Sequence, residues 1–311
     1  MTSHHAQALL AVGAYLRAHD YRFMTVTPST HRRINRRPGN ERARDLRGIF
    51  GWSRPFAADE VDPDLLALMR EARILAQDGS LLRSTLRASS LGDMLVFHSA
   101  FPTDEHDAVF FGPDTYRFVG TMGRAFPWLG SGPVRALDIG CGAGAGALAI
   151  ARHFPHAEVV GADINTRALA LSVVNARLAG LDNLTVQHSD LFDSLEGDFD
   201  LIVSNPPYVL DPSELPYRHG GGMRGAELSV RIVKESLAHL RRGGNLMLYT
   251  GVAIAGARDD FLESIRPELE RVCDHWTYDE LDPDIFGGQL GEPGYEDAER
   301  IAAVWLHAIR R

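Results

Sequence analysis

Four successive residues, Asn205-Pro206-Pro207-Tyr208, combine an amide, restrained backbone carbonyls and an aromatic ring. They directly follow the apolar run 201–203, which is typical of a buried strand. Because proline cannot donate to a strand ladder, the tetrapeptide is predicted to be a rigid turn at the strand's carboxyl end. Open α/β sheets bind their ligands at that edge. The residue types suit a flat group that bears an amine, although a plain proline turn is the simpler interpretation of these four residues alone.

A glycine-rich turn lies earlier in the chain, after another predicted strand. Gly140, Gly142 and Gly144 would let a ligand approach the backbone closely, and the helix that follows offers free amides. Asp138 ends the predicted strand before the glycines, which favours a ligand with a positively charged amine over a pyrophosphate. Rossmann dinucleotide sites share the glycine pattern, so a nucleotide-dependent oxidoreductase is an alternative on this motif.

Two further acidic residues follow the next two predicted strands. Asp163 is placed where a carboxylate can accept both ribose hydroxyls. Asp190 is placed to receive an adenine amine, while Leu191 packs on the ring. Each aspartate alone is expected to be a simple strand-end cap. Their succession at the carboxyl ends of consecutive strands predicts an adenosine site.

The elements that position these residues alternate between strand and helix. Strands are predicted at 134–138, 158–162, 184–188, 199–204 and 244–250, and helices at 145–153, 166–179 and 225–241. This alternation predicts an α/β fold with a doubly wound, mostly parallel, Rossmann-like sheet. We also expect a strand at 272–279 and a helix at 299–310.

The amino-terminal third has a different texture. Helices are predicted at 6–19 and 63–78, a strand-like segment at 22–27, and a hairpin from 82–88 and 94–98. A helix is also expected between about 113 and 130. We expect a smaller α+β module, similar to a winged helix, that recognises the substrate. The boundary near 105–110 divides the chain into a module of residues 1–107 and a domain of residues 108–311.

Composition excludes several classes of protein. Of the 311 residues 45% are hydrophobic and 23% charged, which is ordinary for a globular protein. Cys141 and Cys273 are too few for a disulfide framework, and the histidines show no metal-ligand spacing, so no metal site is expected. Cys141 is interpreted as a packing residue. No apolar run or leader pattern indicates a membrane span or secretion, so a cytoplasmic location is expected.

The charge distribution is uneven. The formal net charge of −9 argues against a protein that coats nucleic acid. Residues 31–47 nevertheless hold seven arginines against Glu41 and Asp45. This stretch is either a solvated face or a contact surface for a phosphate-bearing or acidic substrate. The glycine-rich residues 216–225 are expected to form a flexible loop that closes over substrate, or a plain connection.

The ordered motifs resemble a known family. Asp138-Ile-Gly-Cys-Gly-Ala-Gly, Asp163, Asp190 and Asn205-Pro-Pro-Tyr resemble the class I S-adenosylmethionine-dependent methyltransferases. Within that class, residues 108–255 are similar to the small-domain group, which contains HemK-like protein-glutamine methyltransferases and base amino-methyltransferases. Phe111-Gly-Pro-Asp-Thr-Tyr resembles the group's Pro-x-Pro-x-Thr-Glu segment, with Tyr116 in place of glutamate. Tyr249-Thr250-Gly251 departs from the glutamate-glycine pair usual there, and the amino-terminal module does not match the group's helical bundle.

The resemblance implies a cofactor and a mechanism. S-Adenosylmethionine would contact Thr115, Asp138, Gly140, Gly142, Gly144, Asp163, Ile164, Asp190, Leu191 and Asn205. Asn205 and Pro206 would accept the two N–H bonds of a planar nitrogen while Tyr208 stacks on its plane. The acceptor is predicted to be a planar amide or amine, with a protein glutamine favoured over a base amine of RNA or DNA and over a small metabolite. An oxidoreductase would leave the tetrapeptide without a role, and the intact motifs argue against an inactive partner subunit.

Overall fold

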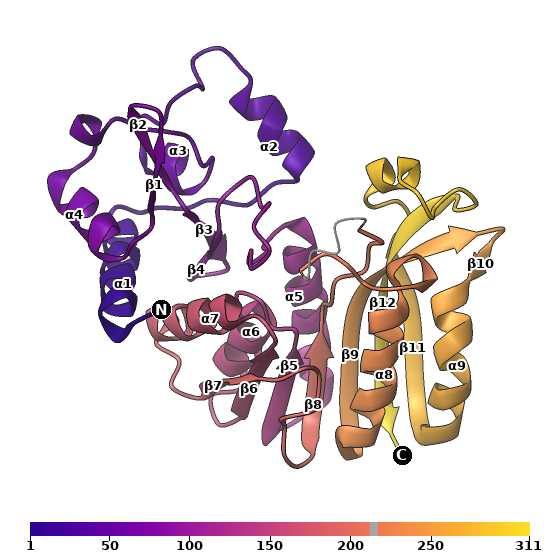
Figure 1. The fold of residues 1–311 in the computed structure, drawn as a ribbon. Coiled ribbons are helices and arrows are strands. Elements are labelled where there is room, and N and C mark those ends of the chain that lie inside the picture. The colour runs from indigo at the N-terminus through magenta and orange to yellow at the C-terminus, as the bar shows by residue number, and fades with distance from the viewer. Residues whose placement is uncertain (212–216) are drawn as a thin grey trace.

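The chain folds into an amino-terminal α+β module that packs against one end of a large sheet domain (Figure 1). The computed structural model describes residues 1–211 and 217–311. Pro216, the first residue of the predicted loop 216–225, lies outside the described residues.

The large sheet confirms the predicted fold class. Its strand order is β11-β12-β9-β8-β5-β6-β7, with β10 (Arg258–Asp259) paired to β9. The five strands that run parallel are β5 (Arg135–Ile139), β6 (Glu158–Asp163), β7 (Leu184–His188), β8 (Phe199–Ser204) and β9 (Leu240–Ala255). β12 (Arg300–Arg310) lies antiparallel to both β9 and β11 (Cys273–Asp282). The chain order reverses between β5 and β8, and ligands bind at such switch points.

Helices cover both faces of this sheet. α5 (Pro113–Ala125) and α6 (Ala145–His153) pack on one face, where Phe118 and Met122 meet Ala136 and Leu201. α8 (Glu227–His239) and α9 (Asp260–Val272) pack on the other face, where Val233 meets Leu246. α7 (Thr166–Ala179) lies over β6 and β7. The predicted helices 145–153 and 166–179 have the observed bounds.

The module contains helices and two separate hairpins. Its helices are α1 (Ser3–Ala18), α2 (Pro28–Asn35), α3 (Leu46–Phe50) and α4 (Pro63–Glu71). One hairpin joins β1 (Leu75–Asp78) to β2 (Leu81–Ser84), and the other joins β3 (Leu86–Leu91) to β4 (Met94–Ser99). α1 and β4 dock on α7, where Leu178 packs closely on Gly13 and Phe97. The module therefore shares a hydrophobic core with the sheet domain.

Three predicted elements are wrong in type or length. Residues 299–310 form strand β12, not a helix, because β12 lies between two strands and is buried on both faces, so its apolar run shows no alternation. The helix predicted over 63–78 ends at Glu71, and its last residues form strand β1. Residues 22–27 are not a strand: Phe23 O accepts one backbone bond from Ser90 N (2.8 Å) without starting a ladder. Residues 82–84 belong to β2, while the hairpin itself is confirmed.

Candidate active site

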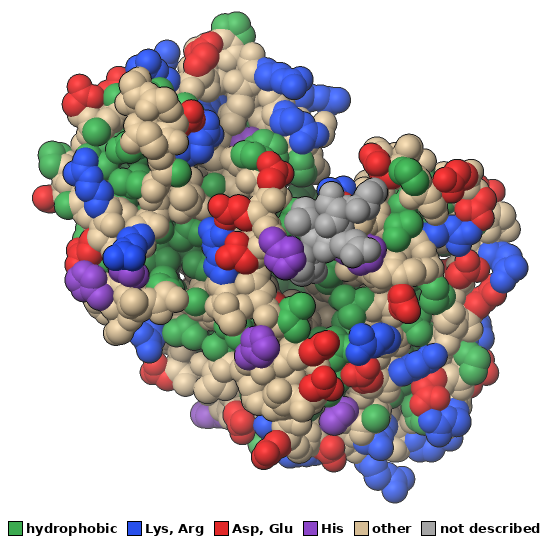
Figure 2. Space-filling model, viewed as in Figure 1, with side chains coloured by type: hydrophobic (Ala, Val, Ile, Leu, Met, Phe, Trp, Pro, Cys, Tyr) green, Lys and Arg blue, Asp and Glu red, His purple; other side chains and the backbone are tan. Residues whose placement is uncertain are grey.

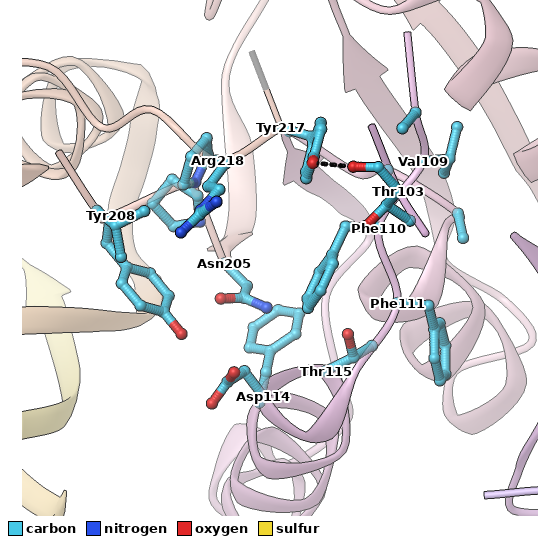
Figure 3. A pocket seen from close by; sticks show the side chains of 18 of the residues that line it. Thr103, Val109, Phe110, Phe111, Asp114, Thr115, Asn205, Tyr208, Tyr217 and Arg218 are labelled. Atoms are coloured by element: carbon cyan, nitrogen blue, oxygen red, sulfur yellow. Dashed lines mark hydrogen bonds between the residues drawn. The ribbon is translucent and has the colours of Figure 1, made fainter. Parts of the chain in front are cut away.

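A cavity of about 950 Å³ opens at the carboxyl ends of the parallel strands, between the sheet domain and the module. This volume is typical of small-molecule sites. Of the residues predicted from sequence, it is lined by Thr115, Asp138, Gly140, Gly142, Asp163, Ile164, Asp190, Leu191, Asn205, Pro206 and Tyr208. Figure 3 shows Thr115, Asn205 and Tyr208 around it. Thr27, Ser29 and Arg32 of the module complete the wall.

Gly144 is the predicted site residue that does not line the cavity. It precedes α6 with a left-handed backbone (φ +86°), and a Cβ there would lie 3.0 Å from Ser172 Oγ of α7. Gly144 is therefore required for the turn and for close packing on α7. Sequence spacing alone could not separate it from Gly140 and Gly142, which share its left-handed backbone but have open space where a side chain would be.

Asp138 lies beneath the glycine turn and is only 2% exposed. Its Oδ2 accepts a hydrogen bond from Ala147 N (2.8 Å) at the start of α6. Gly146 must remain small because an added Cβ would lie 2.7 Å from the same oxygen. Burial raises the pKa of Asp138 to about 7, the Ala147 N–H opposes that rise, and Asp163 adds to it. A cationic group nearby would favour the ionised carboxylate.

Asp163 ends β6 and holds two turns together. Its Oδ2 accepts from Gly142 N (2.8 Å) and its Oδ1 accepts from Asn165 N (2.8 Å). Burial raises the pKa of this carboxyl as well, against the effect of these backbone donors. Each carboxylate oxygen has a second acceptor position. The capping role and a contact with ligand hydroxyls are therefore compatible.

Two apolar side chains and one carboxylate form the far wall of the cavity. Ile164 is 51% exposed, which is unusual for a large aliphatic residue that lines a cavity. Leu191 has a left-handed backbone (φ +47°), a conformation that costs a non-glycine residue about 1 kcal/mol or more. Asp190 lies directly before it on the same wall. Such strain is concentrated at binding sites, and the wall suits a flat, amine-bearing ring.

Asn205 lies at the carboxyl end of β8 and lines the cavity. β8 ends at Ser204, whose Oγ donates to Ile139 O (2.8 Å) and ties the turn to the neighbouring strand β5. The Asn205 side chain points into the cavity (Figure 3). Its Oδ1 is buried, with no hydrogen-bond partner among residues 1–211 and 217–311. Since a buried acceptor without a partner is costly, this oxygen is free to accept a hydrogen bond from a molecule in the cavity.

Tyr208 is fixed by neighbours that the sequence did not reveal. Its ring makes edge contacts with Tyr249 and Phe286, at 6.5 and 5.8 Å between centroids. Its hydroxyl is hydrogen bonded to Asp114, and Asp114 Oδ1 also accepts from Tyr249 Oη (2.8 Å) and Arg117 Nη1 (3.0 Å). Burial raises the pKa of Tyr208 well above its usual value, so the phenol stays neutral.

Two departures from the family pattern have a structural explanation. Thr250 is buried with its Oγ1 2.8 Å from Ser229 Oγ of α8, while Gly251 leaves room for the Tyr208 ring: a Cβ there would lie 2.3 Å from ring carbon Cδ2. Tyr116 does not line the cavity, and its hydroxyl accepts from Thr25 N (3.1 Å) of the module. Position 116 therefore joins the two parts of the chain.

Aromatic and polar side chains form the cavity entrance. The rings of Phe110 and Tyr217 are stacked, with centroids 6.5 Å apart, and the Tyr217 hydroxyl donates to Thr103 O (Figure 3). Arg218 Nη2 donates to Gln289 Oε1 (2.9 Å) in the connection between β11 and β12. Tyr217 and Arg218, from the described part of the predicted loop, thus lie beside the site as expected.

Asp114 and Phe286 are the residues that sequence reasoning missed. Asp114 lies inside the segment that resembles the family, but only Thr115 of that segment was predicted as a site residue. Phe286 carried no sequence signal. It is 40% exposed, lines the cavity and has a left-handed backbone (φ +55°).

Cys141 is part of the glycine turn and is buried. Burial raises the pKa of its thiol well above the usual range, and the carboxylates of Asp163 and Asp138 add to that rise. A neutral thiol is a poor nucleophile. This agrees with a packing role. Across the described residues, no cluster of histidine, cysteine and acidic side chains has the geometry to hold a metal ion, and no helix is both long and apolar enough to span a membrane.

The fold is that of Rossmann-like methyltransferases. The crystal structure of Methanocaldococcus jannaschii TYW2 in complex with AdoMet superimposes with a TM-score of 0.50 at 14% identity, covering 73% of this chain and 86% of that one. Residues 131–256 match the family model "Methyltransferase small domain". This match agrees with the resemblance of residues 108–255 to the small-domain group of class I S-adenosylmethionine-dependent methyltransferases.

Curated relatives share this part of the chain. A ribosomal protein uL3 glutamine methyltransferase of Xanthomonas campestris pv. campestris is 36% identical over 156 residues, which is 46% of this chain and 49% of the relative. A release factor glutamine methyltransferase of Rhodopirellula baltica is 38% identical over 143 residues, or 41% and 48% of the two chains. The chain spans about half the length of the curated relatives it matches.

Proposed function

We propose that this protein transfers a methyl group from S-adenosylmethionine to the side-chain amide nitrogen of a protein glutamine. The observation that carries the proposal is the buried Oδ1 of Asn205, which faces the cavity without a partner among the described residues. The names of the relatives support a glutamine as acceptor. A cytoplasmic location follows as part of the same proposal.

The chemistry of the lining residues fits the cofactor. Asp138, with its raised pKa, would be ionised by the ammonium of the methionine part. Asp163 would accept the ribose hydroxyls, and Thr115 lies on the same wall. Ile164 and Leu191 would hold the adenine ring between apolar surfaces, with its amine directed to Asp190. When bound, the cofactor supplies an electrophilic methyl group on a sulfonium.

The remaining residues would position the acceptor. An amide nitrogen is a weak nucleophile because its lone pair is delocalised into the carbonyl. Asn205 Oδ1 and the carbonyl of Pro206 would each accept one of its N–H bonds, which fixes the nitrogen and stabilises the positive charge that develops on it. The nitrogen would gain the methyl group as the sulfur–methyl bond breaks to leave a neutral thioether, and its displaced proton would pass to solvent. Tyr208, held through its hydroxyl by Asp114, would provide a fixed aromatic wall.

An exocyclic amine of a nucleic-acid base has the same flat NH₂ geometry and is the second candidate acceptor. The observation that favours it is Arg32 of α2 in the wall of the cavity. A small metabolite is the third. The three are separated by a labelling experiment, in which S-adenosylmethionine with a radioactive methyl group is incubated with a lysate that is then fractionated. We expect label in protein, released on hydrolysis as N-methylglutamine; label confined to RNA, DNA or small molecules would refute the proposal.

Asn205→Ala tests the proposed hydrogen bond between Asn205 and the acceptor nitrogen. We expect kcat to fall at least about 100-fold, because an acceptor-orienting hydrogen bond is lost, while the Kd for S-adenosylmethionine changes less than about threefold. Asp163→Ala is the matched control, since it should weaken cofactor binding first. Calorimetric titration and single-turnover kinetics measure the two effects. An Asn205→Ala enzyme that turns over normally but binds cofactor poorly would exclude the assigned role.

A further inference from the structure

Four arginines form an exposed basic surface at α2. Arg32 and Arg33 lie in the helix, Arg36 caps its carboxyl end and Arg37 follows, and we name these four the α2 arginine surface. None of the four guanidinium groups has a hydrogen bond or ion pair with a residue in the described ranges. Some other exposed arginines, such as Arg258 and Arg271, are paired with carboxylates. The α2 arginine surface thus holds positive charge that the protein itself does not neutralise.

This positive charge is local, because the rest of the molecule is negatively charged. Residues 31–47 carry seven arginines and two acids, a formal charge of +5, whereas the whole chain carries −9, so the remaining residues carry −14. The spacing i, i+1, i+4, i+5 brings the four side chains to one side of the helix and its end. Figure 2 shows basic side chains gathered over α2 next to the hollow at the module boundary. Repulsion between these cations would be relieved by an extended polyanion.

The surface is continuous with the entrance of the methyl-transfer cavity. Pro28, Ser29 and Arg32 of α2 line the cavity, so Arg33, Arg36 and Arg37 lie just outside it. Other parts of the cavity rim are acidic. Asp104, Asp284 and Glu292 are exposed and line the same cavity.

The entrance has a basic surface at α2 and acidic residues on the cavity rim, and this combination favours one kind of polyanion over another. An acidic peptide that reached the cavity would pass the exposed carboxylates of Asp104, Asp284 and Glu292, which would repel it. A strand of phosphates that runs along α2 outside the cavity avoids them, while a basic polypeptide that enters is attracted by them. The entrance therefore matches a basic protein segment that lies beside nucleic-acid phosphates.

We propose that the α2 arginine surface binds the phosphate backbone of an RNA strand that accompanies the acceptor protein. This inference rests on the proposed function for its acceptor, and deepens it: the substrate is a glutamine in a protein–RNA particle. Arginine is suited to this contact because its planar fork donates two parallel hydrogen bonds to a phosphate. The contact is independent of base sequence and weakens as salt is added.

The experiment measures binding of a fluorescein-labelled poly(U) oligonucleotide by fluorescence anisotropy between 50 and 200 mM salt. The variant Arg33→Gln/Arg36→Gln/Arg37→Gln removes three phosphate contacts and leaves the cavity-lining Arg32 in place. Each contact to a single strand contributes about 0.7 to the slope of log K against log salt. Across this fourfold salt range we expect the wild type to lose about 20-fold more affinity than the variant.

The matched control is Arg17→Gln/Arg22→Gln/Arg70→Gln, which removes the same charge from exposed positions of the same module. We expect it to bind poly(U) as the wild type does. Thermal melting of both variants reports whether the fold is intact. Equal binding by wild type and the α2 variant, or an equal loss in the control, would overturn the proposal. Displacement of poly(U) by an equal charge of poly-glutamate would instead assign the surface to acidic protein.

The outcome is separable from that of the proposed function. Methylation of a free glutamine peptide should be unchanged in the α2 variant, whereas methylation of the acceptor within intact ribosomal particles should fall. If poly(U) binding follows the prediction and label never enters glutamine, the RNA surface stands and the acceptor is wrong. If glutamine is labelled and poly(U) does not bind, the glutamine acceptor stands and the RNA surface is wrong.

Discussion

At the scale of single residues, the buried carboxyl of Asp138, a proposed cofactor contact, makes stability depend on pH. Its pKa in the folded protein is raised from 3.8 to about 7, mainly by burial. Between those pH values the folded state therefore holds a proton that the unfolded state has released. The stability that this proton contributes is lost as pH rises through that window. The pKa of Asp163 is raised too, so the neighbouring carboxyl acts in the same direction.

Asp138→Asn should separate stability from binding. Without cofactor, we expect the melting temperature of the variant to exceed that of the wild type by a margin that grows from pH 5 to about pH 7 and then levels off. The variant should nevertheless bind S-adenosylmethionine about 10- to 100-fold more weakly, because a charge-assisted contact to the ammonium is lost. Thermal scans across pH and calorimetry at pH 7.5 measure the two effects. A variant less stable than wild type at every pH would show that the carboxyl is a structural requirement.

At the scale of elements, one side chain links the module to the glycine turn. Asn175 of α7 is fully buried. Its Oδ1 accepts from Phe97 N (2.8 Å) of β4, and its Nδ2 donates to Phe97 O (3.0 Å) and to Ala143 O (2.9 Å) of the glycine turn. A displacement of β4 is thereby transmitted to the backbone that is proposed to hold the cofactor.

Asn175→Leu should disturb folding and cofactor binding together. The change leaves two backbone carbonyls and one N–H buried without partners, so we expect a loss of roughly 3 kcal/mol in the free energy of unfolding. Cofactor affinity should fall as well. Asn183→Leu is the control, since Asn183 also donates to three carbonyls, of Ala151, Phe154 and Ala157, away from the cavity. Asn183→Leu should lower stability in urea titrations without changing cofactor affinity. If both variants lowered cofactor affinity equally, Asn175 would have no specific role in linking β4 to the glycine turn.

The parts of the fold that the sequence predicted are those with a local cause. The helices 145–153 and 166–179 begin after turn residues and end before a chain reversal, so their bounds follow from nearby sequence. β12 was mistaken for a helix because its partners, β9 and β11, lie far away in sequence. Leu75–Asp78 is an exception, because it was joined to the preceding helix although its partner β2 follows after a two-residue turn.

The same division applies to the candidate site. Asp138, Asp163, Asp190 and Asn205 all lie at or just beyond the carboxyl ends of strands, so the parallel topology brings them to one cavity. Asp114 and Phe286 reach Tyr208 from α5 and from the connection between β11 and β12, which no spacing in the sequence indicates. Gly144 shares the turn but faces α7, which depends on a helix crossing that periodicity does not predict.

At the scale of the whole molecule, the proposed boundary near residue 107 divides the sequence but does not divide the core. Leu171, Val174 and Leu178 of α7 share one hydrophobic cluster with Leu9 and Phe97 of the module. The cavity likewise takes walls from both parts. The module is therefore a structural support of α7 in addition to its proposed role as a contact surface for substrate.

A fragment of residues 108–311 should show this dependence. We expect it to bind the dye ANS and to self-associate in size-exclusion chromatography, because removal of the module uncovers the apolar side of α7. Its melting temperature should lie below that of the full chain. The full chain under the same conditions is the control. A monomeric fragment that does not bind ANS would establish that the two parts fold independently.

Phe286 and its loop suggest how acceptors change within such enzymes. The loop lies after residue 256, beyond the matched family segment, and its ends are anchored through Ile285 N to Ile301 O (2.7 Å) and Gln289 Nε2 to Leu210 O (3.2 Å). Residues 286–288 between those anchors line the cavity, and the Phe286 ring makes an edge contact with Tyr208. Exchange of these three residues would alter which acceptor is admitted while methyl transfer stays intact, so substrate range can diverge, or be engineered, independently of catalysis.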